Sequence, residues 1–559
     1  MIRRNFLKVG LSAGTMTTAS GAVPAESNMA GSRKKPRLLF YHDGRHPLIY
    51  MYEPPIEKEQ YEAAVDELAG TPVDAIMFCL GDGRTVLHDT QIGELWGHNV
   101  DKWPHLIFRR AHQNAKHLID TGHDPLRIVC DRAHEKGLLF YPTLLVQQGT
   151  GDRSEDVRGS EFRFKNRHLE IGARGDIDPG HPCASCLDFK HAAVRDERIA
   201  LIKETANNYP IDGFELQLNY QSSYFHPAEV EAGKAIMTEW IRDVRRALTE
   251  SGVNRELVVR VPADVQGCES VGLDVRRWIS EGLVDIVVGE TLGGPELLDH
   301  TSDLRTLVEA AKDSATRIHA ALHALVDSDR LHQAANEMLR AAASNYWAQG
   351  VDGLYLAYWF GYWPYKAPFY EMLREAPHPD VMGPKDKTYY IPTMTGRYPE
   401  PRLEPNLKMQ LPVDLNVGQT VRLELPISDD LTHWDRTGRV HQAVLRFRVM
   451  NVTEQDRLQF SINGRRLPDE LLRTINEMYR MSAPRYRTGS GYWFIFKLDR
   501  EHWPIKGRNG IEISLTRRDP DVVPQVFLRD VELEIQYLLG RNFHRDQDTD
   551  LGPYEQAMF

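Results

Sequence analysis

The sequence predicts an α/β protein with two domains, a (β/α)8 TIM barrel followed by a C-terminal antiparallel β-sandwich. The first observation behind this prediction is an alternation of apolar runs with helical patterns, which extends over about residues 36–375 and contains eight runs of strand length. The second is a turn containing an aspartate, which recurs before four of these runs. The third is a change after about residue 385 to short alternating runs separated by turn signals such as Asn463-Gly464.

The expected barrel strands follow one another along the chain at uneven spacing. They span residues 37–41, 76–80, 137–146, 214–218, 257–262, 286–290, 317–325 and 354–358. The helices expected between them include residues 194–209, 229–251, 275–281, 304–312 and 329–349. An open doubly wound sheet is the alternative. Such a sheet usually carries a Gly-rich phosphate-binding turn after its first strand, and Tyr41-His42-Asp43-Gly44 is not one.

We assign residues 36–385 to the barrel, 386–540 to the sandwich and 541–559 to a polar tail. Two long connections, residues 81–110 and 147–188, follow the second and third barrel strands. In a barrel such connections lie on the catalytic face, where we expect them to shape the substrate site. The runs expected to form the sandwich are residues 420–425, 442–450, 457–462, 492–498, 510–515 and 525–537.

The first 25 residues predict export. Arg3 and Arg4 are followed by Asn-Phe-Leu-Lys, a weakly apolar stretch and the small residues around Ala25, which together resemble a twin-arginine signal peptide. We therefore expect residues 1–25 to be a signal peptide and the mature protein to be periplasmic or extracellular. A disordered N-terminus with a chance arginine pair and an uncleaved signal anchor are the alternatives.

Composition excludes several classes of protein. The chain of 559 residues has 68 basic and 79 acidic side chains and a net charge of −11, which argues against a general nucleic-acid binder. Five cysteines are too few for a disulfide scaffold. No apolar run approaches the roughly 20 residues of a membrane span, so we expect no span after signal removal. The oligomeric state is not predicted, and we expect no cofactor.

Polar and aromatic side chains occupy one parity of the expected barrel strands. Side chains alternate along a strand, so Glu215, Gln217 and Asn219 share one face of the fourth strand. Counted from the aspartate before each strand, Glu290 on the sixth strand has the same parity. We expect this face to point into the barrel, although satisfied polar core residues are the alternative interpretation. The same alternation suggests further residues at the mouth: Asp43, Arg260, Asp264, His319, His323, Tyr355, Trp359 and Trp363.

Paired carboxylates on neighbouring barrel strands suit glycoside cleavage, which needs two of them about 5 Å apart for retention or about 6.5–9.5 Å apart for inversion. We expect Glu290, which is nearer the rim, to be the proton donor and Glu215 to be the nucleophile or base, with Asp264 in reserve. The aromatic rings would stack on sugar faces. The side chains expected to bind hydroxyls or tune the acids are Asp43, Gln217, Asn219, Arg260, His319, His323, Tyr355, Trp359 and Trp363.

Two stretches resemble bacterial glycosyl-hydrolase-like barrel proteins, the family-ten-like glycosylhydrolase group. They are Cys186-Leu-Asp-Phe through Asp212-Gly-Phe-Glu215, and Val259-Arg-Val-Pro through Glu281-Gly-Leu-Val-Asp285. The resemblance implies a TIM-barrel hydrolase that acts on a carbohydrate substrate. Chitinase-type barrels end the fourth-strand motif in a glutamate that donates the proton, and this chain has Asn219 there.

Two other functions remain open from the sequence. Amides at Gln217 and Asn219 favour a glycan-binding protein that has lost catalysis. His319 and His323, together with the first-strand histidine, would suit a metal-dependent hydrolase. Cys183 and Cys186 have the spacing of a metal or disulfide pair, and ordinary loop residues are the alternative.

Overall fold

The structure is a computed structural model that describes residues 35–559, except 148, 150, 182, 292–296, 327–332, 394–408, 477–490, 541 and 546–559. The chain divides into two units, Met1–Lys35 and Pro36–Phe559. The expected signal peptide lies outside the described residues. Among the residues that are described, none forms a helix with the length and apolarity needed to span a bilayer.

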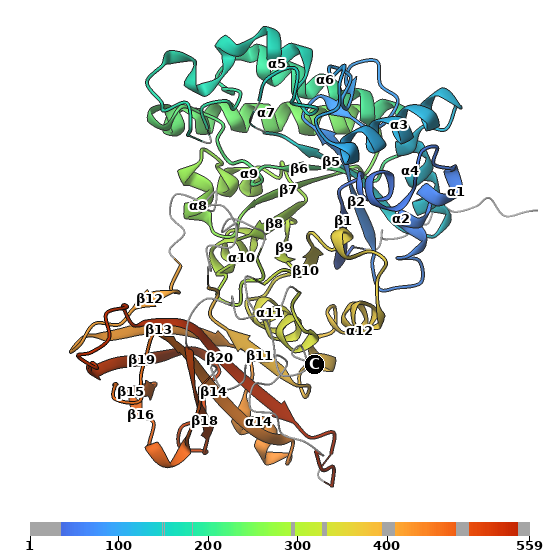
Figure 1. Ribbon diagram of the computed structural model, residues 1–559. Helices are drawn as coiled ribbons and strands as arrows, with labels where there is room; N and C mark the ends of the chain where they lie inside the picture. Colours follow the sequence, from blue (N-terminus) through green and yellow to red (C-terminus); the bar gives the residue numbers. More distant parts are fainter. Residues whose placement is uncertain are drawn as a thin grey trace, which may run out of the picture. The chain divides into compact units, whose positions relative to one another are not determined.

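Eight parallel strands form the closed barrel that the alternation predicts (Figure 1). The sheet closes because β1 pairs in parallel with both β2 and β10. The barrel strands are β1 (Leu38–His42), β2 (Ala75–Asp82), β5 (Leu139–Leu145), β6 (Gly213–Gln217), β7 (Glu256–Pro262), β8 (Ile286–Glu290), β9 (Arg317–Leu322) and β10 (Gly353–Leu356). Two short strands extend the sheet beyond β2, namely β3 (Thr85–Val86) and β4 (Glu94–Leu95).

Helices connect the barrel strands along the chain. The longer ones are α3 (Leu106–Asp120), α4 (Pro125–Glu135), α6 (Ala192–Asn208), α7 (Val230–Ser251), α11 (Asn336–Ala348) and α12 (Ala367–Glu375). The shorter ones are α1 (Lys58–Tyr61), α2 (Ala63–Asp66), α5 (Glu161–Lys165), α8 (Val265–Ser270), α9 (Val275–Ser280), α10 (Arg305–Ala311) and α13 (Pro379–Met382). The helix expected from residue 329 begins at Asn336, and residues 327–332 lie outside the described part.

The recurring aspartate of the sequence ties each new strand to its neighbour. Asp212 donates its backbone N–H to the carbonyl of Phe140, and its carboxylate accepts the N–H of Phe140 at 2.9 Å. The three other aspartates bond to the neighbouring strand in the same way, because a carboxylate at this point satisfies an N–H that the ladder leaves unpaired. These pairs are Asp74 with Leu38, Asp285 with Leu257 and Asp352 with Ile318.

The alternation along the strands separates two apolar clusters. Phe214 and Leu216 of β6, and Leu218 directly after it, belong to the large cluster between strands and helices. The lumen holds a separate cluster, to which most barrel strands contribute one parity. Its members include Leu39, Tyr41, Met77, Cys79, Tyr141, Val258, Val288, Tyr355 and Ala357. The lumen parity predicted from the sequence is therefore the one that the structure shows.

The C-terminal part consists of two antiparallel sheets, as predicted. One has the order β11-β20-β14-β18-β17, with β12 also paired to β20, and the other has the order β13-β19-β15-β16. Apolar side chains between them form a second core, which includes Leu445, Phe447 and Ile513. The elements are β11 (Lys387–Tyr390), β12 (Val413–Asp414), β13 (Thr420–Ile427), α14 (Leu431–Arg436), β14 (Val440–Met450), β15 (Arg457–Ile462), β16 (Arg465–Arg466), β17 (Leu472–Asn476), β18 (Gly491–Leu498), β19 (Gly507–Arg517) and β20 (Phe527–Tyr537).

His300 and helix α11 join the barrel to the sandwich. The ring of His300 is fully buried, with Nε2 2.9 Å from the carbonyl of Met338 and Nδ1 accepting the N–H of Tyr390 at 2.9 Å. Asn345 of α11 donates to the carbonyls of His300 and Pro426 at 3.0 and 2.9 Å. Burial lowers the pKa of His300 to about 3, so the ring is neutral near neutral pH.

The neutral state of His300 predicts sensitivity to acid. The unfolded chain takes up a proton near pH 6.5 and the folded protein only near pH 3, so the stabilising contribution is complete above 6.5 and is lost as the pH falls towards 3. Between pH 7.5 and pH 5, the unfolding free energy of the wild-type protein should therefore fall by about 1–2 kcal/mol more than that of His300→Gln. Denaturant unfolding at both pH values measures it, with the exposed His123→Gln as control. Identical drops in wild type and His300→Gln would contradict the assignment.

Candidate active site

A buried guanidinium joins two buried glutamates inside the barrel. Arg260 extends from β7, and its Nε lies 3.2 Å from Oε1 of Glu215 on β6. Its Nη1 lies 3.7 Å from Oε1 of Glu290 on β8. All three side chains are at most 1% exposed. The two carboxylates expected from the sequence are therefore brought to one guanidinium, because neighbouring parallel strands place these positions side by side.

Glu215 is the deeper carboxylate of the two. It is the third residue of β6 and pairs in register with Val258, whereas Glu290 ends β8 and pairs with Pro262. Thr143 donates to Oε2 of Glu215 at 2.5 Å, and the Tyr355 hydroxyl lies 2.9 Å from both of its oxygens. Glu215 is thus held on several sides by polar groups.

Glu290 is held by residues nearer the end of the barrel. Asn219, two positions beyond the end of β6, donates its amide N–H to Oε2 of Glu290. The Nε2 atom of His323 lies 2.7 Å from Oε1. Glu290 therefore contacts three of the side chains singled out from the sequence, namely Asn219, Arg260 and His323.

The two carboxyl groups have pKa values shifted in opposite directions. Burial raises the pKa of Glu215, and the lowering effects of Arg260, Thr143 and Tyr355 do not overcome it. Burial would also raise the pKa of Glu290, but Arg260, His323 and Asn219 outweigh it and lower the pKa below its usual value. The surroundings therefore favour an ionised Glu290 and keep a proton more readily on Glu215.

Several buried polar atoms around this pair lack a hydrogen-bond partner among the described residues. They include the amide oxygens of Gln217 and Asn219 and two nitrogens of Arg260, one of which lies at ion-pair distance from Glu215. A buried polar group without a partner costs about 1–3 kcal/mol, so such groups are few in folded proteins. Their concentration beside two carboxylates indicates a place where a polar ligand supplies the missing partners.

A cavity of about 610 Å³ lies at the end of β1, and the rings of Phe360 and Tyr41 connect its lining to the Arg260 cluster. Asp43, Arg45 and Tyr358 line it with Trp96 and Phe360. The ring of Phe360 lies 5.7 Å from that of Tyr41, and Tyr41 in turn packs against the Arg260 guanidinium at 4.5 Å. We name this cavity the rim pocket.

Tyr358 gives the rim pocket an exposed aromatic face. It is 44% exposed, its ring lies 4.8 Å from that of Phe360, and its φ of 59° is in the left-handed region. This region is strained for a bulky side chain, and such strain is concentrated at functional sites. Buried Asp82 fixes the opposite wall by accepting from Arg45 and Trp96, both at 3.2 Å.

Three residues expected at the mouth lie outside the Arg260 cluster. Asp264 follows the end of β7 and caps α8 by accepting the N–H of Gly267 at 2.8 Å, so it is not part of the carboxylate cluster. Trp359 is 1% exposed and donates to the carbonyl of Leu322 at 3.0 Å, so its ring is a core ring and no stacking platform. Trp363 is partly buried and lines a small cavity with Met51, which shares His46 with the pocket at the end of β1.

Four other expected residues have defined positions. Arg260 directs its charge at Glu215 and Glu290 and lowers the pKa of both, as expected of a residue that tunes the acids. His319 is 0% exposed and lies deep in the lumen, where its ring occupies the space that a side chain at Gly353 would need. Burial lowers the pKa of His319 to about 3, so the ring is neutral. Tyr355 contacts Glu215 in the barrel interior, and Asp43 lines the rim pocket, with Oδ1 accepting two backbone N–H groups.

Sequence reasoning missed Tyr41, Thr143, Tyr358 and Phe360. Thr143 and Tyr41 have the lumen parity, so the alternation that selected Glu215 could have found them. Tyr358 and Phe360 belong to the aromatic run after the eighth strand, where the alternation ends and gives no direction to a side chain.

The described residues provide little support for a metal site. No group of three or more His, Cys, Asp or Glu side chains that could hold a metal ion occurs among them. Cys183 and Cys186 are both buried and form no disulfide, and Sγ of Cys183 lies 2.9 Å from Nδ1 of His181. The disulfide interpretation of this pair is therefore wrong.

The exposures of Tyr358 and Trp359 predict opposite effects of their removal. Tyr358→Ala removes an exposed ring in a strained conformation, so we expect the stability to stay within about 1 kcal/mol while glycan binding weakens. Trp359→Ala removes a core ring, so the unfolding free energy should fall by about 3–5 kcal/mol. Denaturant unfolding combined with calorimetric titration of a glycan measures both. Weaker glycan binding by a fully stable Trp359→Ala protein would contradict this.

No family model matches the chain, and no curated protein matches its sequence. Solved structures with similar folds include the Paenibacillus sp. cycloisomaltooligosaccharide glucanotransferase complexed with cycloisomaltoheptaose, at 12% identity and TM-score 0.36 over 89% of this chain and 57% of that one. The α-L-fucosidase isoenzyme 2 of Paenibacillus thiaminolyticus has 11% identity and TM-score 0.41, over 62% of this chain and 49% of that one. A chitinase from Chromobacterium violaceum has 12% identity and TM-score 0.34, over 61% of this chain and 99% of that one. The chain spans about half the length of the first two structures, and likenesses of this size assign it no activity.

Proposed function

We propose that the chain is a glycoside hydrolase that cleaves a poly- or oligosaccharide with Glu290 and Glu215. The observation that carries this proposal is the set of buried, unpartnered polar atoms on Gln217, Asn219 and Arg260 around the two carboxylates. A sugar ring offers several hydroxyl groups that both donate and accept hydrogen bonds, so it can satisfy amide oxygens and guanidinium N–H groups together. Two carboxylates with different proton affinities are what hydrolysis of the glycosidic bond requires.

The pKa directions favour a division of roles opposite to the one expected from the sequence. Glu290, whose pKa is lowered, suits the anionic role of nucleophile or base. It is also the last residue of β8, and so the carboxylate nearer the carboxyl ends of the barrel strands. Glu215, whose pKa is raised, suits the role of the protonated acid. Arg260 would hold both groups in place and stabilise negative charge on Glu290.

The rim pocket is the proposed entry for the sugar chain. Its volume of about 610 Å³ is in the range of small-ligand sites. Tyr358 would stack on a sugar face, and Asp43 and Arg45 would bind hydroxyls.

A glycan-binding protein without catalysis is the second candidate. The observation that favours it is the burial of both carboxylates, of which Glu215 is 0% and Glu290 1% exposed. Under this proposal the carboxylates are structural partners of Arg260, and the rim pocket alone contacts the glycan. We also propose, from Arg3 and Arg4, that the protein acts outside the cytoplasm.

Replacement of each glutamate by glutamine separates the candidates. For Glu215→Gln we expect turnover of an unactivated oligosaccharide to fall by about 10²–10⁴, because general acid catalysis contributes that much, and turnover of an activated aryl glycoside to fall much less. Glu290→Gln should lower turnover of both substrates alike, since an anionic nucleophile or base is needed for each. Steady-state kinetics on xylo-, cello-, malto- and chito-oligosaccharides and their nitrophenyl glycosides measures both effects.

A glutamate outside the site serves as the control for these kinetics, and three outcomes would contradict the proposed roles. Glu269→Gln, on the partly exposed end of α8, is the matched control and should leave turnover unchanged. If the activated aryl glycoside restored turnover only in Glu290→Gln, Glu290 would be the acid and Glu215 the nucleophile or base, as expected from the sequence. Full activity of both mutants would exclude the carboxylate pair. Glycan binding without turnover by the wild-type protein would establish the second candidate instead.

A further inference from the structure

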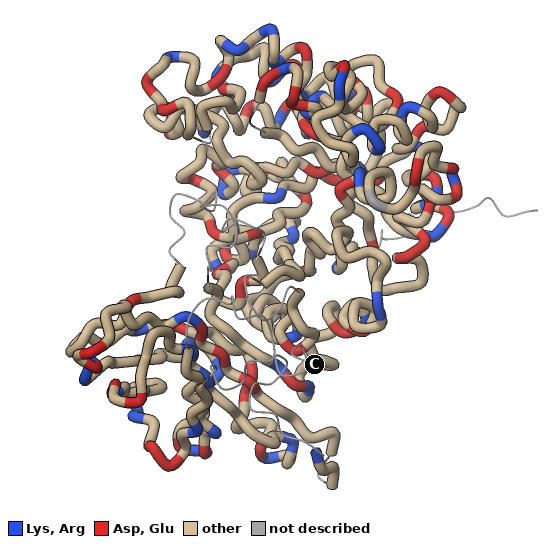
Figure 2. The backbone as a smooth tube through the Cα atoms, in the orientation of Figure 1, with Lys and Arg blue, Asp and Glu red and all other residues tan. Residues whose placement is uncertain are grey.

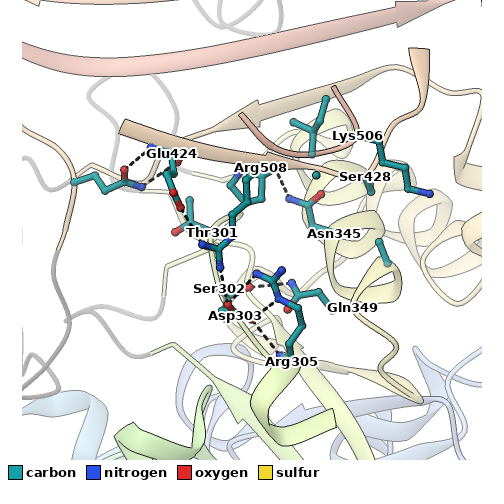
Figure 3. A pocket seen from close by; sticks show the side chains of 15 residues that line it. Thr301, Ser302, Asp303, Arg305, Asn345, Gln349, Glu424, Ser428, Lys506 and Arg508 are labelled. Atoms are coloured by element: carbon teal, nitrogen blue, oxygen red, sulfur yellow. Dashed lines mark hydrogen bonds and ion pairs between the residues drawn. The ribbon is translucent and has the colours of Figure 1, made fainter. Parts of the chain in front are cut away.

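A second hollow lies where the barrel meets the sandwich, apart from the site already described. Two cavities of about 440 and 500 Å³ adjoin there and share the lining residues Ala348, Ser428 and Lys506. One side is helix α11, and the other is formed by the segment after β13 and the start of β19 (Figure 3). We name this hollow the junction groove. None of its lining residues lines the rim pocket or belongs to the Arg260 cluster.

Two tryptophans lie at one end of the junction groove. Trp347 of α11 and Trp434 of α14 both line the cavity and are partly exposed. The indole N–H of Trp347 donates to the carbonyl of Ala376 at 2.7 Å, which fixes the ring. Trp434 packs edge-on against Tyr537, and a side chain at Gly383 would come within 3.0 Å of its ring. The groove thus presents positioned aromatic rings from both domains.

The other end of the junction groove is charged but internally paired. Arg508 of the sandwich lies 3.3 Å from Asp303 of the barrel and 3.4 Å from Glu424 of β13. Figure 3 shows these side chains together with Arg305, which also pairs with Asp303 at 2.8 Å. Figure 2 shows that Lys and Arg positions alternate with Asp and Glu positions along the described backbone of both domains.

Between the two ends, polar groups remain available to a ligand. The ammonium of Lys506 is exposed and has no hydrogen-bond or ion-pair partner among the described residues. Ser344 of α11 lines the groove, is 9% exposed, and its hydroxyl has no partner in the described part of the chain. A polar group buried in this way costs free energy unless a ligand or solvent satisfies it.

We propose that the junction groove is an accessory glycan-binding site, which holds an oligosaccharide segment at a distance from Glu290. Aromatic rings next to single hydrogen-bonding groups fit a sugar, because its C–H faces stack on indole rings while its hydroxyls bond to Lys506 and Ser344. The mixed and paired charges favour neutral pyranose units. That this glycan is also the substrate of the barrel rests on the proposed function, whereas the binding of a glycan in the junction groove does not depend on it.

Affinity electrophoresis of the full-length Glu290→Gln protein tests this site without turnover. The native gels contain hydroxyethylcellulose, xylan, dextran, chitosan or polygalacturonate at graded concentrations. We expect retardation by at least one of the neutral polymers. The dissociation constant for it should rise about tenfold in Trp434→Ala and about fivefold in Lys506→Ala. Trp503→Ala, which removes a partly exposed sandwich tryptophan outside the groove, is the matched control and should leave it unchanged.

The outcomes separate this site from the rim pocket and from the catalytic proposal. Lys506 is exposed, so Lys506→Ala tests the site even if Trp434→Ala unfolds, which thermal denaturation reveals. Unchanged retardation in both variants, with loss in Tyr358→Ala, would place all binding at the rim pocket and overturn the proposal. Absence of retardation by every neutral polymer would overturn it as well. Failure of catalysis in the kinetic experiments would leave the binding measured here intact.

Discussion

The contact on which the candidate site depends is the ion cluster that Arg260 forms with Glu215 and Glu290. Two carboxylates and one guanidinium, all at most 1% exposed, carry one excess negative charge in the barrel interior unless one carboxyl holds a proton. Loss of the guanidinium would leave buried anions without a partner, which typically costs about 3–5 kcal/mol. The same ion cluster therefore contributes to the stability of the barrel interior and sets the proton affinities of both glutamates.

The barrel geometry explains how this cluster arises. β6, β7 and β8 lie side by side, so their lumen-facing positions meet without any contribution from a loop. Rigid strands then hold the charged groups, while the rim pocket is built from the segments that follow β1, β2 and β10. This division suits an enzyme, in which fixed charges act on a bond while neighbouring loops bind the substrate. The junction groove likewise combines residues from separate elements, since its two tryptophans come from the two domains.

The sequence predicted the parts of the molecule that repeat. The strand alternation located the eight barrel strands and assigned Glu215, Gln217 and Tyr355 to the lumen, because parity along a regular strand determines direction. The positions of Asp264 and Trp359 could not be predicted, because both residues follow the end of a strand, where a helix cap and a core position decide the orientation. The division of proton affinity between Glu215 and Glu290 could not be predicted either, since it depends on His323 and Asn219, which follow the ends of two different strands, β9 and β6.

The most direct measurement of the central claim is infrared difference spectroscopy of the protonated carboxyl group. Spectra of wild type, Glu215→Gln and Glu290→Gln, recorded as a pH series, report which glutamate holds its proton to the higher pH. The account predicts a carboxylic-acid C=O band in the wild-type protein that persists above the pH at which an ordinary glutamate ionises and is absent from Glu215→Gln, and that shifts to lower pH in Glu290→Gln, because the charge of Glu290 helps to raise the pKa of Glu215. A band that disappears in Glu290→Gln and persists in Glu215→Gln would contradict it, because Glu290 would then hold the proton.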